Sequence, residues 1–105
     1  MDATDEIMER FDFDEVYKAM KCLRWEWAHK DGGMRVPSLV EIKTNARDLL
    51  ERIERDYKNK PDRGHGSTST GGFEAYWRRW DDGELEFGLS FILSEWQWTG
   101  SIDAR

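Results

Sequence analysis

The C-terminal third of the chain alternates apolar and polar residues, a pattern typical of a half-buried β-strand. The alternation is clearest over residues 85–93, which read LEFGLSFIL. A three-residue loop over residues 81–83 would fold residues 73–79 back antiparallel to this segment. Such loops need a left-handed residue in last place, and Gly83 stands there. The pattern therefore predicts a β-hairpin.

The register of the predicted hairpin follows from matching its two faces. The loop over residues 81–83 gives three apolar pairs on one face: Phe73 with Phe91, Ala75 with Leu89, and Trp77 with Phe87. A two-residue loop would pair apolar with polar residues, and a slip by one residue would expose the whole apolar row. Because two strands alone are marginally stable, we expect a third from residues 34–36, from the tail after Trp98, or from another chain.

Two upstream segments carry apolar residues at spacings of three and four, which predicts amphipathic helices. The first begins at Asp12, with the signature of a capping box, and is expected to run to about Ala28. The second begins with a capping box formed by Ser38 and Glu41 and should end near Lys58.

These elements predict one α+β domain over residues 1–105. Two helices are expected to pack on one face of a small antiparallel sheet centred on the C-terminal hairpin. We expect residues 1–11 to form an acidic N-terminal extension. Residues 59–72, rich in glycine, serine and threonine, are expected to form a flexible linker.

The net charge of −6 arises within the first 15 residues. Seven acidic residues stand there against one base, Arg10, whereas the rest of the chain carries 15 acidic and 15 basic residues. Such a patch repels the phosphates of nucleic acid and attracts basic protein surfaces, so we expect no direct nucleic-acid binding. The candidate docking residues in it are Asp5, Glu6 and Glu9. The alternative is a solvated segment that only aids solubility.

Catalytic and metal-binding chemistry has little support in the sequence. Cys22 is the one cysteine, and His29 and His65 are the two histidines. Cys22 and His29 could share one side of the first helix, but nucleophilic catalysis also needs an oxyanion site and an orienting group. The spacing of these residues does not match a zinc site. We therefore expect a protein that is not an enzyme, with no catalytic residue, no metal and no cofactor.

The sequence also predicts a cytoplasmic protein. It lacks a run of ~18 apolar residues that could span a membrane. Its first residues are acidic, unlike the basic start of a signal peptide. A lone cysteine cannot form an intramolecular disulfide, which fits a reducing compartment.

The large aromatic residues exceed what the predicted core can hold, because six tryptophans occur in the chain. In the predicted register one group lies on the hairpin face opposite the helices: Tyr76, Trp80, Ile92 and Trp96. Trp25 stands ~200° around a helix from Trp27, so both cannot face one core. Exposed aromatic patches mark partner surfaces, which makes this group and Trp25 the candidate partner-binding residues. The alternative is that Trp96 and Trp98 turn back and seal the core.

A series of short motifs carries a resemblance to known proteins. The motifs are WEW at 25–27, VPSLVEI at 36–42, alanine at 46 with LL at 49–50, STGGFEA at 69–75, and LEF at 85–87 continuing to EW at 95–96. In this order and spacing, over residues 16–96, the chain resembles small accessory proteins encoded by tailed bacteriophages and prophages. The resemblance brings no active site. It implies a host-cell setting, where such proteins often bind and disable host machinery, CRISPR and other defence systems included.

Two expectations for function follow. The first is a non-enzymatic phage accessory protein in the cytoplasm of a host bacterium, which binds and inhibits a host protein or nucleoprotein complex such as a CRISPR–Cas defence system. The aromatic residues would anchor the partner, and the N-terminal acids would steer toward its basic surface. The second is a self-assembling structural phage protein, a homodimer without an inhibitory role.

Overall fold

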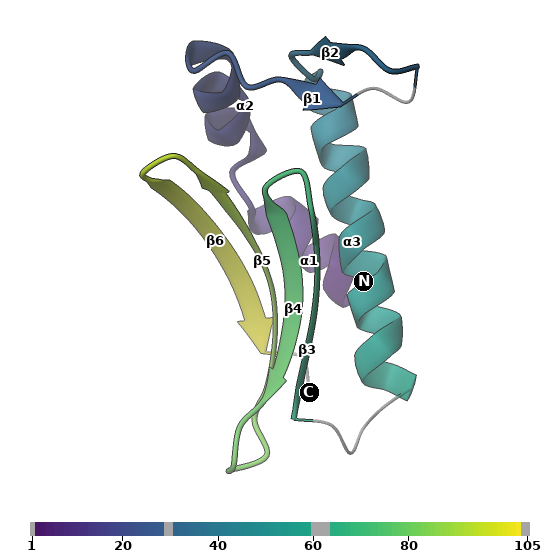
Figure 1. Cartoon of the computed structure of the whole chain (residues 1–105). Coiled ribbons are helices and arrows are strands. Elements are labelled where there is room, and N and C mark those ends of the chain that lie inside the picture. The colour runs from purple at the N-terminus through teal and green to yellow at the C-terminus, as the bar shows by residue number, and fades with distance from the viewer. Residues whose placement is uncertain (1, 29–30, 60–63, 104–105) are drawn as a thin grey trace.

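The computed structural model describes residues 2–28, 31–59 and 64–103, and it has the predicted α+β class. The elements in chain order are α1 (Ala3–Arg10), α2 (Phe13–Cys22), β1 (Trp27–Ala28), β2 (Met34–Arg35), α3 (Leu39–Asn59), β3 (His65–Thr70), β4 (Phe73–Arg79), β5 (Leu85–Leu93) and β6 (Trp96–Asp103). Strands β3, β4, β5 and β6 form one antiparallel sheet in that order (Figure 1). Strands β1 and β2 form a separate antiparallel pair.

The predicted register of the β4–β5 hairpin is confirmed. Phe73 lies opposite Phe91 and Trp77 lies opposite Phe87. The loop closes through a hydrogen bond from the Gly83 N–H to the Trp80 carbonyl, 3.0 Å long. Gly83 has a φ of +89°, the left-handed conformation that the loop requires.

The sheet gains a strand on each side of this hairpin. β6 includes the tail after Trp98, one of the three expected sources. The sequence predicts a flexible linker over residues 59–72, but residues 65–70 form β3 and residue 59 ends α3. Residues 60–63 of that linker lie outside the described residues. The turn from β3 to β4 consists of Gly71 and Gly72, whose φ values of +57° and +88° match the tight hairpin turn that favours glycine.

The core forms where alternate residues of β4 and β5 meet the helices. The sheet contributes large buried rings, and α2 and α3 contribute aliphatic side chains: Phe73, Trp77, Phe87 and Phe91 from the sheet, with Val16, Met20, Leu49 and Leu50 from the helices. Figure 1 shows the helices gathered on one side of the large sheet, whose other face is uncovered. We call this uncovered side the outer face.

The segment expected to be an acidic extension forms a helix that contributes to the core. The Asp2 side chain caps α1 by accepting the Asp5 N–H, and Ile7 is fully buried. On α3 the buried carboxylate of Glu54 accepts hydrogen bonds from the Thr4 N–H (2.9 Å) and the Thr4 hydroxyl (3.3 Å). The fold therefore has three helices in its described part rather than the expected two.

α2 ends earlier than its apolar spacing predicted, and that prediction was wrong. The Arg24 N–H donates to the Lys21 carbonyl (3.2 Å), and the Trp25 N–H donates to the Met20 carbonyl (2.8 Å). Arg24 has a φ of +52°, so this is a Schellman motif with arginine in the place that glycine usually takes. The chain beyond it is extended, and the helical angle between Trp25 and Trp27 no longer applies.

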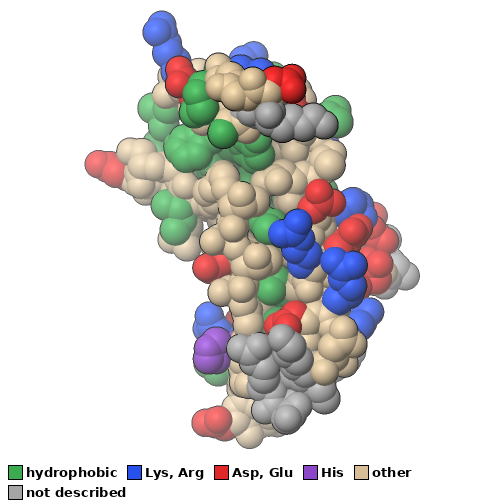
Figure 2. All heavy atoms as spheres, turned by 45° about the vertical axis from the view of Figure 1, so that its right-hand side comes forward, with side chains coloured by type: hydrophobic (Ala, Val, Ile, Leu, Met, Phe, Trp, Pro, Cys, Tyr) green, Lys and Arg blue, Asp and Glu red, His purple; other side chains and the backbone are tan. Residues whose placement is uncertain are grey.

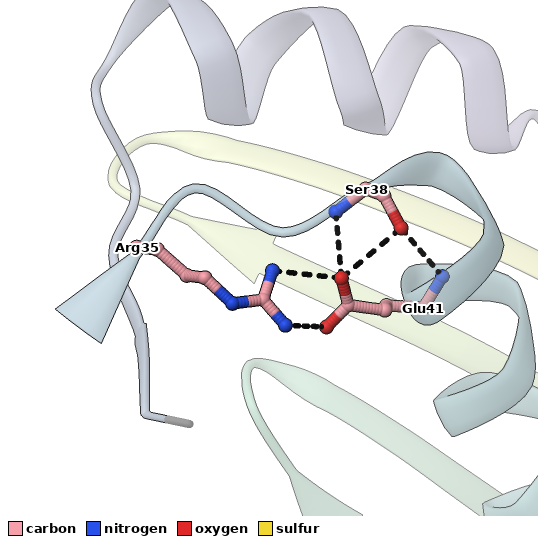
Figure 3. A network of polar contacts seen from close by, with 3 residues as sticks. All are labelled: Arg35, Ser38 and Glu41. Atoms are coloured by element: carbon pink, nitrogen blue, oxygen red, sulfur yellow. Dashed lines mark hydrogen bonds and ion pairs between the residues drawn. The ribbon is translucent and has the colours of Figure 1, made fainter. Parts of the chain in front are cut away.

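The predicted capping box at the start of α3 is confirmed (Figure 3). The Ser38 hydroxyl oxygen accepts the Glu41 N–H at 3.2 Å, and the Ser38 N–H donates to Glu41 Oε1 at 3.4 Å. The Arg35 guanidinium donates hydrogen bonds to both oxygens of the Glu41 carboxylate, from Nη1 to Oε1 at 2.7 Å and from Nη2 to Oε2. This guanidinium, helped by Ser38, lowers the pKa of Glu41 to about 2. The small β1–β2 sheet is thereby tied to α3.

Candidate functional site

The outer face of the sheet is a polar surface with one aromatic ring near its middle. Tyr76 lies opposite Gly88 across the β4–β5 pair. A Cβ placed on Gly88 would meet the Tyr76 ring and hydroxyl at 2.5 Å, so the ring rests directly over this glycine. Burial of the phenol raises the pKa of Tyr76. A shallow depression of about 500 Å³ surrounds the ring, lined by polar residues that include Ser67, Glu74 and Gln97.

Arg78 joins the aromatic residues of this face into one cluster. Its guanidinium carbon lies 5.8 Å from the centre of the Tyr76 ring and 5.1 Å from the centre of the Trp80 ring. Both distances are typical of cation–π contacts. Across the hairpin, Arg78 Nε lies 4.0 Å from Glu86 Oε1. We call Tyr76, Arg78, Trp80 and Glu86 the Trp80 surface.

Trp80 forms one wall of a second depression, of about 320 Å³. Its other lining residues come from the end of α1, from the β4–β5 loop and from β5 and β6: Arg10, Glu84, Leu85, Glu86, Ser101 and Ile102. Trp80 is 48% exposed, so much of its ring is open to a partner. The depression combines an aromatic wall, two carboxylates, one arginine side chain and apolar edges, so its acids outnumber its single base. This combination fits a long basic side chain.

Trp96 does not lie on the outer face as predicted. β5 and β6 are joined by a two-residue turn, Ser94 and Glu95, which sets Trp96 opposite Leu93 on the helix side of the sheet. Ser94 has a φ of +56°. Residues other than glycine rarely adopt a positive φ, so the sequence did not indicate a turn at this serine. Trp96 is nevertheless 63% exposed, and it stacks on Trp98 with ring centres 6.3 Å apart.

The predicted aromatic patch is therefore divided between two ends of the sheet. Trp80 stands at the β4–β5 turn, whereas Ile92 and Trp96 stand at the β5–β6 turn, a strand length away. Ile92 does lie on the outer face and is 56% exposed. Other exposed apolar residues belong to elements at this second end: Leu23, Met34, Val36 and Val40. Figure 2 shows hydrophobic side chains gathered over this end of the molecule.

Trp25 belongs to the edge of the core rather than to either surface. It is partly buried, and its ring meets Phe91 edge-on with centres 6.2 Å apart. Because α2 has already ended, Trp25 and Trp27 both pack against the core cluster. The Nε1 atom of Trp25 is buried without a hydrogen-bond partner among the described residues.

The three acidic residues proposed for docking differ in their surroundings. Asp5 accepts a hydrogen bond of 2.8 Å from Arg47 Nη1, which lowers the pKa of Asp5. Its charge is thus already partnered within the chain. Glu9 is exposed and Glu6 is half-exposed on α1, the helix whose last residue, Arg10, lines the depression beside Trp80.

The described residues offer no grouping for catalysis at a metal. No three residues among histidine, cysteine, aspartate and glutamate lie close enough to hold a metal ion within residues 2–28, 31–59 and 64–103. Cys22 is exposed at the end of α2, and His65 lies on β3 opposite Arg78. His29, which the sequence would allow to share one side of the helix with Cys22, lies outside the described residues. Within the same ranges, no helix is long and apolar enough to cross a membrane.

The sequence predicted Tyr76 and Trp80 as partner-binding residues but did not include Arg78, which contacts both rings. The predicted register already placed Arg78 on the same face of β4 as Tyr76 and Trp80, opposite Glu86, and that signal was sufficient to include it. Searches against known protein families, curated proteins and solved structures find nothing similar to this chain.

Proposed function

We propose that this chain is a non-enzymatic protein that binds another protein through the Trp80 surface. The observation that carries the proposal is the stacking of Arg78 between Tyr76 and a Trp80 ring that is half open to solvent. Tryptophan, tyrosine and arginine are the residue types that dominate the energetics of protein interfaces. Here they stand together on a sheet face that no described element covers.

The partner in this proposal presents a basic side chain to the depression beside Trp80. An arginine or lysine there would lie against the indole and near the carboxylates of Glu84 and Glu86. The contact combines cation–π attraction with a charge-assisted hydrogen bond. The charge of the whole chain favours such a partner at long range, because the net charge is −6 and its excess acids lie in the first 15 residues.

The role we propose for this binding is inhibition of a host defence complex by a phage accessory protein. The phage setting in this proposal comes from the short motifs of the sequence alone, since the comparisons with known proteins find no relative. The proposed target surface is a basic groove that holds nucleic acid, as in a CRISPR–Cas nuclease. A basic side chain of that groove would enter the Trp80 depression, and the acids of α1 would lie against its other bases. Occupation would exclude nucleic acid by competition for the same basic residues.

A plaque assay tests the inhibitory role. The chain is expressed in a bacterium whose CRISPR–Cas system targets an infecting phage, and plaques are counted against an empty vector. We expect the wild-type chain and Trp96→Ala to restore plaques and Trp80→Ala to fail. Trp96→Ala is the matched control, because it removes an exposed tryptophan at the opposite end of the sheet.

Two results would refute the proposal in that assay. If the wild-type chain restores no plaques, inhibition of that CRISPR–Cas system is not its role. If Trp80→Ala restores plaques as fully as the wild-type chain, the Trp80 surface is not the inhibitory site. Immunoblots of each variant show that the comparison is made at equal protein levels.

A further inference from the structure

We propose that a second copy of this chain pairs with β6 along its free edge, antiparallel and centred on Thr99, to give one continuous eight-stranded sheet. β6 (Trp96–Asp103) is the last strand of the sheet and pairs on one side with β5 in unbroken register. Among the described strands none lies beyond it. The other edge strand, β3, runs beside α3 (Figure 1).

The backbone of β6 directs hydrogen-bonding groups toward this edge. Leu93 and Trp96 close a two-residue hairpin, and closing pairs of such hairpins exchange both hydrogen bonds. Bonded and non-bonded pairs then alternate along the strand. The N–H and C=O groups of Gln97, Thr99 and Ser101 consequently point away from β5.

The edge lacks the features by which proteins usually prevent strands from pairing. Residues 96–102 contain no charged residue and no proline, and no bulge interrupts their register with β5. Natural sheets protect edges of this length with lysine, proline, a bulge or a covering element. An uncharged edge of seven residues, followed by Asp103 at the end of the strand, is a template for pairing with another strand.

The side chains of β6 favour a copy of the same strand centred on Thr99. This register sets Trp98 opposite Gly100 of the second copy, in a non-bonded pair whose side chains lie closest. The atoms nearest to a Cβ placed on Gly100 belong to Phe11, at 3.4–3.9 Å, so Phe11 packs beside this glycine and the indole would lie on its edge side. The chain already uses this arrangement internally, where the Tyr76 ring covers Gly88.

The neighbouring symmetric registers fit less well. Centring on Trp98 would bring the two indoles into the same closest pair, and centring on Gly100 would place two glycines opposite each other, with no side chain to pack across that pair. On the outer face, the Thr99 register sets Gln97 opposite Ser101 of the second copy and the two threonines opposite each other. These polar pairs carry no charge, and six backbone hydrogen bonds form by the alternation described above.

Oligomeric state and a cross-link together test the inference. The chain has a mass of 12.5 kDa, so light scattering of the purified protein should give about twice that value. Thr99→Pro should convert the dimer to a monomer of unchanged far-UV circular dichroism, because the N–H it removes faces the edge and not β5.

A disulfide cross-link determines the register of the two β6 strands. It also tests the dimer if Thr99→Pro does not fold. In a Cys22→Ser background, Thr99→Cys should form an intermolecular disulfide on mild oxidation, since Cα atoms in a bonded pair lie ~5.5 Å apart. The control is Ser90→Cys, which faces the same side of the sheet on β5 and pairs with Thr99. Its distance to its symmetry mate, ~14 Å across three strand spacings, is too long for a disulfide.

Three outcomes would overturn the inference. They are a monomer at all concentrations tested, a dimer that persists unchanged in Thr99→Pro, and a dimer in which Ser90→Cys cross-links as readily as Thr99→Cys. These experiments use the purified chain alone. Their outcome for the β6 dimer therefore does not depend on whether the Trp80 surface binds a host partner.

Discussion

The guanidinium of Arg78 lies 5.1 Å from the centre of the Trp80 ring and holds this half-exposed indole against the outer face of the sheet. Exposed cation–π contacts of this kind contribute about 0.5–1 kcal/mol. Because Arg78 also approaches Tyr76 and Glu86, it connects every member of the Trp80 surface. The order of this surface should therefore depend on one arginine.

Replacing Arg78 by alanine should free the Trp80 ring without unfolding the chain. We expect a lower heteronuclear NOE for the Trp80 indole N–H in Arg78→Ala, measured by NMR. Arg79→Ala is the matched control, since Arg79 is the next residue of β4 and points to the other face. Equal NOE values in the wild-type chain and Arg78→Ala would show that the stacking does not order the ring.

A second prediction concerns the contact between β3 and the core. Trp77 Nε1 donates a 2.8 Å hydrogen bond to Asp56 Oδ2 on α3, and a Cβ on Gly66 would stand 2.5 Å from that nitrogen. Gly66→Ala should therefore lower the free energy of unfolding by about 1–3 kcal/mol, as overpacking does. Gly64→Ala should be nearly neutral, because nothing lies within 4 Å of its Cβ position. Urea denaturation measures both, and a neutral Gly66→Ala would contradict the packing described.

A third prediction tests whether α1 is part of the folded domain. Ile7 is fully buried, so Ile7→Ala should cost about 2–5 kcal/mol of unfolding free energy. Glu9→Ala, on the exposed side of the same helix, should change it by less than about 0.5 kcal/mol. If residues 1–11 were only a solvated extension, thermal denaturation would give the same midpoint for both variants.

A fourth prediction follows from the pKa of Glu41, which Arg35 and Ser38 lower to about 2 from an ordinary value of 4.5. A carboxyl whose pKa falls on folding stabilises the fold fully above its ordinary pKa and loses that contribution as pH falls toward the folded value. The stability advantage of the wild-type chain over Glu41→Gln should thus be constant above about pH 4.5 and shrink between pH 4.5 and 2. Arg35→Gln should weaken this pH dependence, and an advantage that grows as pH falls would disprove the pairing.

Elements with strong local signals could be predicted from the sequence. The β4–β5 hairpin follows from its alternation and from Gly83, and the start of α3 follows from Ser38 and Glu41. In each case the residues that define the element are near neighbours in the chain. Local chemistry was therefore enough to fix both the boundary and the face that is buried.

Elements that depend on distant partners could not be predicted in this way. β3 consists of small polar residues with no strand signal of its own, and it forms because β4 supplies its hydrogen bonds and Gly66 makes room for Trp77. α1 is short and acidic, and its place depends on Glu54, 50 residues away. Tertiary context decided both segments.

The candidate site was predictable in part for the same reason. Tyr76 and Trp80 lie on the outer face because the hairpin register was right. Trp96 does not, since a two-residue turn at Ser94 reversed the alternation that had been carried past Leu93. A turn without glycine, proline or asparagine gave no sign of its position.

The most direct test of the central claim is the affinity of the chain for the host partner that we propose, measured by isothermal titration for three forms. Trp80→Ala should weaken binding by ~30-fold or more, the effect of losing an interface hot spot of about 2 kcal/mol. Trp96→Ala, equally a loss of one exposed tryptophan but at the other end of the sheet, should weaken it by less than ~3-fold. Unchanged affinity in Trp80→Ala, or loss in Trp96→Ala alone, would contradict the assignment of the Trp80 surface as the binding site.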